Sequence, residues 1–325
     1  MHRRTLLATG LSLAVPAVIT TPSRAQAYPS QPIRWIVPYP AGGGTDVVAR
    51  TLAEEMKAGL GQQIIVDNKP GAATIIGAEA LKQSKPDGYT IGTGDTSTLS
   101  SNPHLYKTLP YDPAKDFVLI GMMARFNLLL VVHPSVDAKT VKEFIALRAA
   151  AKEPLGYATP GIGTPHHLAM ELFNQRSASK GLHVPYKGAA PAVQDLIAGQ
   201  VPSMFLDLAA GIQHVRAGKV RVLAVASAKR LAALPDAPTL AEAGVADSEA
   251  YALQGLAAPA GTPKPIVERL NAELVKAVGS AAVVKRFDEL GVEPISSTPE
   301  QFAETVRAES TKWGALIKEL KISLD

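Results

Sequence analysis

The sequence predicts an α/β protein of two hinged lobes, in which each lobe is a mostly parallel sheet flanked by helices. From Ile33 onward, short apolar strands alternate with amphipathic helices, the order typical of parallel sheets covered on both faces. A second block of the same kind begins near Leu128, and 325 residues are enough for two domains. Because no low-complexity linker separates the blocks, we expect the chain to cross between the lobes more than once.

The first block shows this alternation element by element. Val48, Leu52 and Met56 recur at helical spacing after the first strand, which predicts an amphipathic helix. Residues 86–88 (PDG) predict a turn into the third strand. The predicted strands are 33–37, 63–66 and 89–93, and the predicted helices are 46–60 and 75–83. Right-handed crossovers place the loops after these strands along one edge of the sheet, where ligands bind.

The second block runs to residue 250, after which the chain returns to the first lobe. Thr140 and Glu143 predict a capping box that opens a helix to residue 151, and Thr239 with Glu242 resembles another. The other predicted strands are 128–132, 183–186, 201–206, 220–227 and 251–258, and the other predicted helices are 164–175, 190–198, 209–217, 265–278, 281–290 and 299–320. We therefore expect one lobe from residues 28–127 plus 251–325 and the other from 128–250.

The N-terminus has the pattern of a secretory signal peptide. Residues 1–4 are basic, residues 5–19 are uncharged and mostly apolar, and residues 25–27 (AQA) form a small-x-small cleavage site. We expect cleavage after Ala27 and a periplasmic location for the mature chain. An uncleaved membrane anchor is the alternative, although Pro16 interrupts a short apolar run. The Arg3-Arg4 pair leaves the choice between general secretion and twin-arginine export open.

The composition of the mature chain excludes several classes of function. Residues 1–27 hold three arginines and no acid, so their removal lowers the formal net charge from +4 by three, to +1. A chain this close to neutral lacks the basic field that nucleic-acid binding requires. Cysteine is absent, which excludes disulfides, thiol chemistry and a lipid-acceptor cysteine. We expect a monomer that binds no nucleic acid.

Two glycine-rich loops follow the same plan, a strand, a Pro/Gly loop and a threonine entering a helix. They are residues 40–45 (PAGGGT) and 159–164 (TPGIGT). Glycines let the backbone approach a ligand, and a helix start offers unpaired N–H groups with partial positive charge, so each loop predicts an anion site built from main chain. Neither loop completes a P-loop or a dinucleotide fingerprint, so no cofactor is expected. Tight packing is the alternative interpretation of either loop taken alone.

Several polar residues near these loops are candidates for ligand contact. His166 and His167 have no metal-binding pattern around them, so we expect one of them to donate a hydrogen bond near the site or to serve packing. Asp46 suits the helix dipole, which favours a structural role. Asp207 would repel an anion unless the ligand carries an ammonium group or the acid holds loop amides. Thr96 belongs to a hydroxyl-rich segment that suits ligand contact or turn formation equally.

Five segments resemble motifs of the Bug-type solute-binding proteins, the periplasmic receptors of tripartite tricarboxylate transporters. They are 37–46 (VPYPAGGGTD), 68–72 (NKPGA), 86–90 (PDGYT), 156–164 (GYATPGIGT) and 184–188 (VPYKG). The resemblance implies a two-lobed periplasmic-binding-protein (Venus-flytrap) fold that holds a ligand carboxylate between the two loops through backbone N–H groups and water. One departure is that Ala73 and Thr74 stand where the family commonly has two glycines, so the ligand shape is expected to differ.

The sequence therefore predicts an extracytoplasmic protein that captures a small organic carboxylate and delivers it to the membrane subunits of a tripartite tricarboxylate-type transporter. It predicts no catalytic residue, metal or cofactor. An exported α/β enzyme using His166 or His167 with Asp207, and a ligand-sensing module for a sensor kinase, are the alternatives. The identity of the carboxylate is left open. The candidate ligand-binding residues are Tyr39, Ala41, Gly42, Gly43, Asp46, Ala73, Thr74, Thr96, Thr159, Gly161, Gly163, Thr164, His167 and Asp207.

Overall fold

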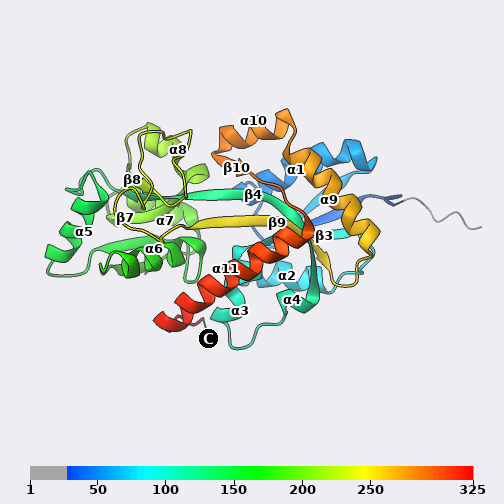
Figure 1. Ribbon diagram of the computed structural model, residues 1–325, viewed down its shortest axis with the longest axis horizontal. Coiled ribbons are helices and arrows are strands. Elements are labelled where there is room, and N and C mark those ends of the chain that lie inside the picture. Colours follow the sequence, from blue (N-terminus) through cyan, green and yellow to red (C-terminus); the bar gives the residue numbers. More distant parts are fainter. Residues whose placement is uncertain (1–27, 325) are drawn as a thin grey trace, which may run out of the picture.

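A computed structural model describes residues 28–324, so the predicted signal peptide lies outside the described residues. Ten strands of the described chain form one continuous sheet with the order β2-β1-β3-β9-β4-β7-β5-β6, to which β8 and β10 add by pairing with β4. Figure 1 shows β4 and β9 running between two groups of helices. The predicted α/β fold class is confirmed, but the sheet is mixed where mostly parallel sheets were predicted, because the strands that join the two groups pair in antiparallel with their neighbours.

The predicted strands and helices of the first group are present with small shifts at their ends. The elements of this group are β1 (Ile33–Val37), α1 (Gly44–Leu60), β2 (Ile64–Asn68), η1 (Ala72–Thr74), α2 (Ile75–Lys82), β3 (Thr90–Asp95), η2 (Ser97–Ser101), α3 (Asn102–Leu105) and α4 (Pro113–Asp116). The short helical segments η1, η2, α3 and α4 were not predicted from the sequence. β1 pairs in parallel with β2 and β3. Helix α1 buries its apolar stripe, including Leu52 and Met56, and ends at Gly61 in the left-handed conformation.

The second group repeats this plan. Its elements are α5 (Val141–Ala150), β5 (Gly156–Thr159), α6 (Pro165–Arg176), β6 (Leu182–Pro185), α7 (Ala189–Ile197), β7 (Ser203–Asp207), α8 (Leu208–Arg216) and β8 (Arg221–Val225). β5 pairs in parallel with β6 and β7. The predicted capping box at Thr140 opens α5. Thr239 and Glu242 exchange the same two hydrogen bonds, but the chain there forms turns and begins no helix.

Two long strands join the groups. β4 (Phe117–Val132) pairs with β9 (Tyr251–Pro259) and β10 (Val292–Pro294) up to Asn127, and with β7 and β8 from Leu128 onward. These pairings are antiparallel. The prediction had found only residues 128–132 of β4. The strands paired with β4 change between Asn127 and Leu128. The sequence predicts the lobe boundary at the same place, and we propose that the two lobes meet there.

The C-terminal helices complete the fold. They are α9 (Lys264–Val278), α10 (Ala281–Leu290) and α11 (Pro299–Leu320), and α11 lies diagonally across the middle of the molecule in Figure 1. Near its start, Phe302 is buried with Leu253 of β9, whereas Trp313 and Ile317 are buried in the core of the second group. Helix α11 therefore bridges the two groups. No helix within residues 28–324 has the length and apolarity needed to span a bilayer.

Candidate functional site

The first loop leaves the start of α1 open. Gly43 is the N-cap residue, with extended backbone (φ −77°, ψ 167°), and no side chain of the described residues caps the first turn. Pro40, Ala41 and the three following glycines are exposed. Because the first amides of a helix have no partner within the helix, this end offers N–H groups and the positive end of the helix dipole to a bound anion.

Asp46 holds the first loop in place. Its carboxylate accepts the Gly42 amide (2.9 Å), Nε of Arg50 (2.9 and 3.0 Å) and Nδ2 of Asn68 (2.9 Å). Asn68 also donates to the carbonyl of Tyr39 (3.0 Å). Burial opposes ionisation, but the hydrogen bonds from Arg50, Gly42 and Asn68 outweigh it and lower the pKa of Asp46. Asp46 is therefore an ionised support of the loop, and the Gly42 amide is already engaged.

Tyr39 is anchored at its other end by Asp95, which sequence reasoning did not select. The Tyr39 hydroxyl donates to Oδ2 of Asp95, and the amide of Thr98 donates to Oδ1 (2.8 Å). Burial raises the pKa of Asp95 despite these bonds. Burial, then Asp95, and finally the charge of Asp207 raise the pKa of Tyr39. Asp207, at the end of β7, is therefore close enough to act on Tyr39 at the end of β1.

Residues 72–74 adopt a left-handed turn without glycine. The φ angles of Ala72, Ala73 and Thr74 are 45°, 49° and 78°, and each such residue costs about 1–2 kcal/mol. Asn102 Nδ2 donates to the Ala73 carbonyl (2.8 Å), and the Thr98 hydroxyl donates to Thr74 Oγ1 (2.8 Å). These hydrogen bonds stabilise the turn, so residues 72–74 adopt a left-handed backbone conformation that glycines would adopt without strain. The Ala73 methyl group is exposed, whereas Thr74 is buried.

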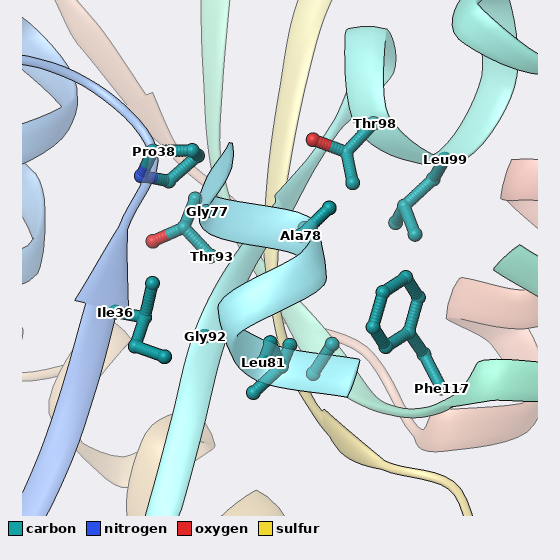
Figure 2. A pocket seen from close by; sticks show the side chains of 12 residues that line it. Ile36, Pro38, Gly77, Ala78, Leu81, Gly92, Thr93, Thr98, Leu99 and Phe117 are labelled. Atoms are coloured by element: carbon teal, nitrogen blue, oxygen red, sulfur yellow. The ribbon is translucent and has the colours of Figure 1, made fainter. Parts of the chain in front are cut away.

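The small cavity in Figure 2 lies beside this turn. It is lined by residues of β1, α2, β3 and η2, including Ile36, Ala78 and Thr98. Its volume of about 10 Å³ leaves room for one water molecule at most. This cavity belongs to the packing of α2 on the sheet and is too small for an organic ligand.

The second loop is more closely packed than the first. Thr164, the N-cap residue of α6, accepts the His167 amide (3.4 Å) and donates to the Gly161 carbonyl (2.8 Å). Gly163 has a positive φ of 74°, and a Cβ there would lie 2.3 Å from Leu105 Cδ1. The Ser101 hydroxyl lies 3.5 Å from the Gly163 carbonyl oxygen. The loop of the second group therefore lies against η2 and α3 of the first.

Two stacked histidines lie under the second loop. Nδ1 of His167 accepts the Gly163 amide (3.0 Å), and Nε2 of His183 shares a hydrogen bond with Thr159 Oγ1 (2.6 Å). Their ring centroids are 4.0 Å apart, and the Tyr157 ring stacks on His183 at 5.1 Å. Burial, and then the charge of His183, lowers the pKa of His167 to about 3, and burial lowers that of His183 to about 4. Both rings are neutral near pH 7.

The remaining candidates have partners of their own. Asp207 accepts from Nε2 of His166 (2.9 Å), so it does not serve to hold loop amides. Nδ1 of His166 is buried and makes no hydrogen bond within the described chain. Thr96 is buried and its hydroxyl accepts the amide of Leu253 on β9 (2.8 Å). Nowhere in residues 28–324 do three or more metal-ligating side chains gather.

The structure thus separates the candidates into exposed backbone and supporting side chains. Ala41, Gly42 and Gly43 are exposed, and Gly161 is half-buried. The supporting side chains are Tyr39, Asp46, Thr74, Thr96, Thr159, Thr164, His167 and Asp207. Sequence reasoning missed Arg50, Asp95 and His183 as members of these networks. From the sequence, Asn68 was named only as the first residue of the family-like segment 68–72 and was given no role in the site.

Comparisons with known proteins give one consistent result. The profile of the family described as "Tripartite tricarboxylate transporter family receptor" matches residues 48–322. Protein BugT of Bordetella pertussis is 35% identical over 317 residues, which cover 97% of each chain. An R. palustris protein solved with adipate superposes with a TM-score of 0.83 at 34% identity, covering 90% of this chain and 97% of that one. The periplasmic binding protein BugD gives 0.80 at 34% identity, covering 91% and 99%.

Proposed function

Given that this chain belongs to the tripartite tricarboxylate transporter receptor family, we propose that it captures a small organic carboxylate between its two glycine-rich loops. The observation that carries the proposal is the uncapped start of α1, presented by exposed residues 40–44. Loop residues 159–164 lie at the carboxyl end of β5 and form the opposite wall of the proposed site. The adipate bound by a relative is a ligand of this chemical class.

The loop chemistry suits a reversible receptor. A hydrogen bond from an amide to a carboxylate contributes about 1.5–3 kcal/mol, so three or four such bonds account for affinities in the micromolar range, about 8 kcal/mol. The engaged amides of Gly42 and Gly163 provide the loop shape. In this proposal the donors are the amides of Gly43, Gly44 and Thr45, the residues at the open start of α1.

The wider setting of the proposal draws on the predicted signal peptide and on the family. The mature chain begins after Ala27, works in the periplasm as a monomer, and delivers its ligand to the membrane subunits of a tripartite transporter. Its lobes, 28–127 with 251–325 and 128–250, close on the ligand by bending of β4 and β9. Because α11 packs on both groups, its second half must move with the second lobe or limit the extent of opening.

The experiment uses the mature chain after removal of any carried-over ligand. Thermal shift and calorimetry against a panel of adipate, malate, citrate, glutamate and benzoate should find at least one ligand. Gly43→Val should abolish its binding, because the side chain stands at the donors while the fold tolerates it: φ is −77° and the nearest heavy atom to a Cβ, the Pro40 carbonyl oxygen, lies at 3.5 Å.

Gly279→Val is the matched control. Gly279, after α9, has φ −84° and a carbonyl oxygen at the same 3.5 Å from a Cβ, but it lies outside the loops. This variant should bind as the wild type does. Absence of any ligand from the whole panel would refute carboxylate capture. Equal binding by both variants would place the ligand elsewhere.

A further inference from the structure

The same hydrogen-bond arrangement stabilises both loops, but the acceptor group differs between them. In each, the third residue of the helix accepts the amide of the glycine that precedes the N-cap residue: Asp46 accepts from Gly42 at 2.9 Å, and His167 accepts from Gly163 at 3.0 Å. The acceptor is a carboxylate in the first loop and an imidazole in the second. Asp46 is neutralised by Arg50, but residues 159–164 have no basic partner of this kind within the described chain.

The imidazole of His167 belongs to a buried stack. His183 and Tyr157 both stack with it, at 4.0 and 6.4 Å between ring centroids, the Tyr157 hydroxyl donates to Glu171, and the charge of Arg148 acts on Tyr157. No charged group makes a hydrogen bond to either imidazole among the described residues. An acceptor at Nδ1 requires that this nitrogen carry no proton, so the arrangement selects the neutral Nε2–H form of His167.

We propose that His167 and His183 are positioning residues that hold the second loop in its ligand-binding shape, and that the neutral imidazole of His167 is required there because the ligand is an anion. Gly163 and Thr159, near the two ends of the loop, are each tied to one ring. This inference rests on the proposed function.

The charge around the site explains why an imidazole suits this position better than an acid. Two acids already lie near Tyr39: Asp207, whose charge raises the pKa of Tyr39, and Asp95, whose own pKa is raised by burial. A carboxylate at residue 167 would add another negative charge next to a captured carboxylate, with no arginine to balance it. Like charges in a partly buried site repel strongly. A neutral acceptor fixes the Gly163 amide without that repulsion.

Three substitutions at one position separate geometry from charge. His167→Asn keeps a neutral acceptor and should bind adipate, or malate if the wild type prefers it, within about threefold of the wild type. His167→Leu removes the acceptor and should weaken binding by about tenfold or more. His167→Asp keeps an acceptor but adds a charge. It should also bind about tenfold more weakly, with a loss that shrinks at high salt.

The result that overturns the proposal is equal affinity of the wild type and His167→Leu, or tight salt-independent binding by His167→Asp. His183→Phe keeps the stack but loses the bond to Thr159, and it should weaken binding with little change in unfolding midpoint. If the wild type binds no carboxylate, the proposed function fails. The hydrogen bond from Gly163 to His167 can still be tested in that case, by ¹⁵N NMR of the imidazole. The spectrum should show His167 as the neutral Nε2–H tautomer at about pH 5, and a proton on Nδ1 would contradict the loop contact.

Discussion

Acidification should destabilise this protein through His167, because the folded chain keeps this ring neutral and the unfolded chain does not. In the folded chain, burial and the neighbouring His183 lower the pKa of His167 from 6.5 to about 3. The unfolded chain therefore takes up a proton on this ring as the pH falls below about 6.5, while the folded chain stays neutral. The stability contributed by the neutral ring is complete above that pH and is lost progressively as the pH falls toward about 3.

The size of the effect follows from the two pKa values. At about pH 5 the ring is charged in almost all unfolded molecules and in almost no folded ones, which favours unfolding by about 2 kcal/mol relative to pH 7.5. His167→Asn has no titrating group at this position and keeps an acceptor for the Gly163 amide. All other titratable groups are common to the two proteins, so the difference between them reports the titration of His167 together with its coupling to His183.

The assay is urea unfolding of the mature wild type and of His167→Asn at the two pH values, followed by far-ultraviolet circular dichroism. The free energy of unfolding should fall by about 2 kcal/mol more in the wild type than in the variant. An equal fall in both proteins would show that His167 is solvated or already protonated when folded. The buried stack described above would then be wrong.

Three further predictions can be checked by the same unfolding measurement. Ala73→Gly should raise the free energy of unfolding by about 0.5–1 kcal/mol, because it relieves a φ of 49°. The control Ala282→Gly, on the exposed face of α10, should lower the free energy of unfolding by about 1 kcal/mol, and a decrease for Ala73→Gly as well would contradict the left-handed turn. Trp313→Ala should cost about 3–5 kcal/mol, since this fully buried ring joins α11 to the second group, and a cost below about 1 kcal/mol would show that α11 does not pack there. Asp46→Asn should cost about 1–3 kcal/mol and weaken ligand binding, because it leaves Arg50 without its buried partner; unchanged stability would exclude the network around Gly42.

Local patterns were enough to predict most helices and strands. The capping box at Thr140 depends on residues three apart, and the apolar stripe of α1 repeats within each turn, so both are visible in the sequence. The first part of β4 was not visible. Gly121, Arg125 and Asn127 interrupt its apolar run, and its stability comes from pairing with β9 and β10, which are more than 100 residues away.

The backbone of the two candidate anion loops could be predicted from the sequence, but the hydrogen-bond networks of side chains that support them could not. Glycine and threonine before a helix identify an anion loop because that geometry is local. The side chains that hold the loops come together only by folding. Asp95 meets Tyr39 across 56 positions, and His183 meets Thr159 across 24.

The sequence by itself thus determined the α/β class, the two loops and the resemblance to a family of carboxylate receptors, because each depends on patterns within about one strand and one helix. Only the tertiary structure decided which loop is open. It showed that α1 begins without a side-chain cap, whereas Thr164 caps α6 and the second loop lies against Leu105. The physical reason is that a free hydrogen-bond donor is defined by what surrounds it, and those neighbours come from distant parts of the chain.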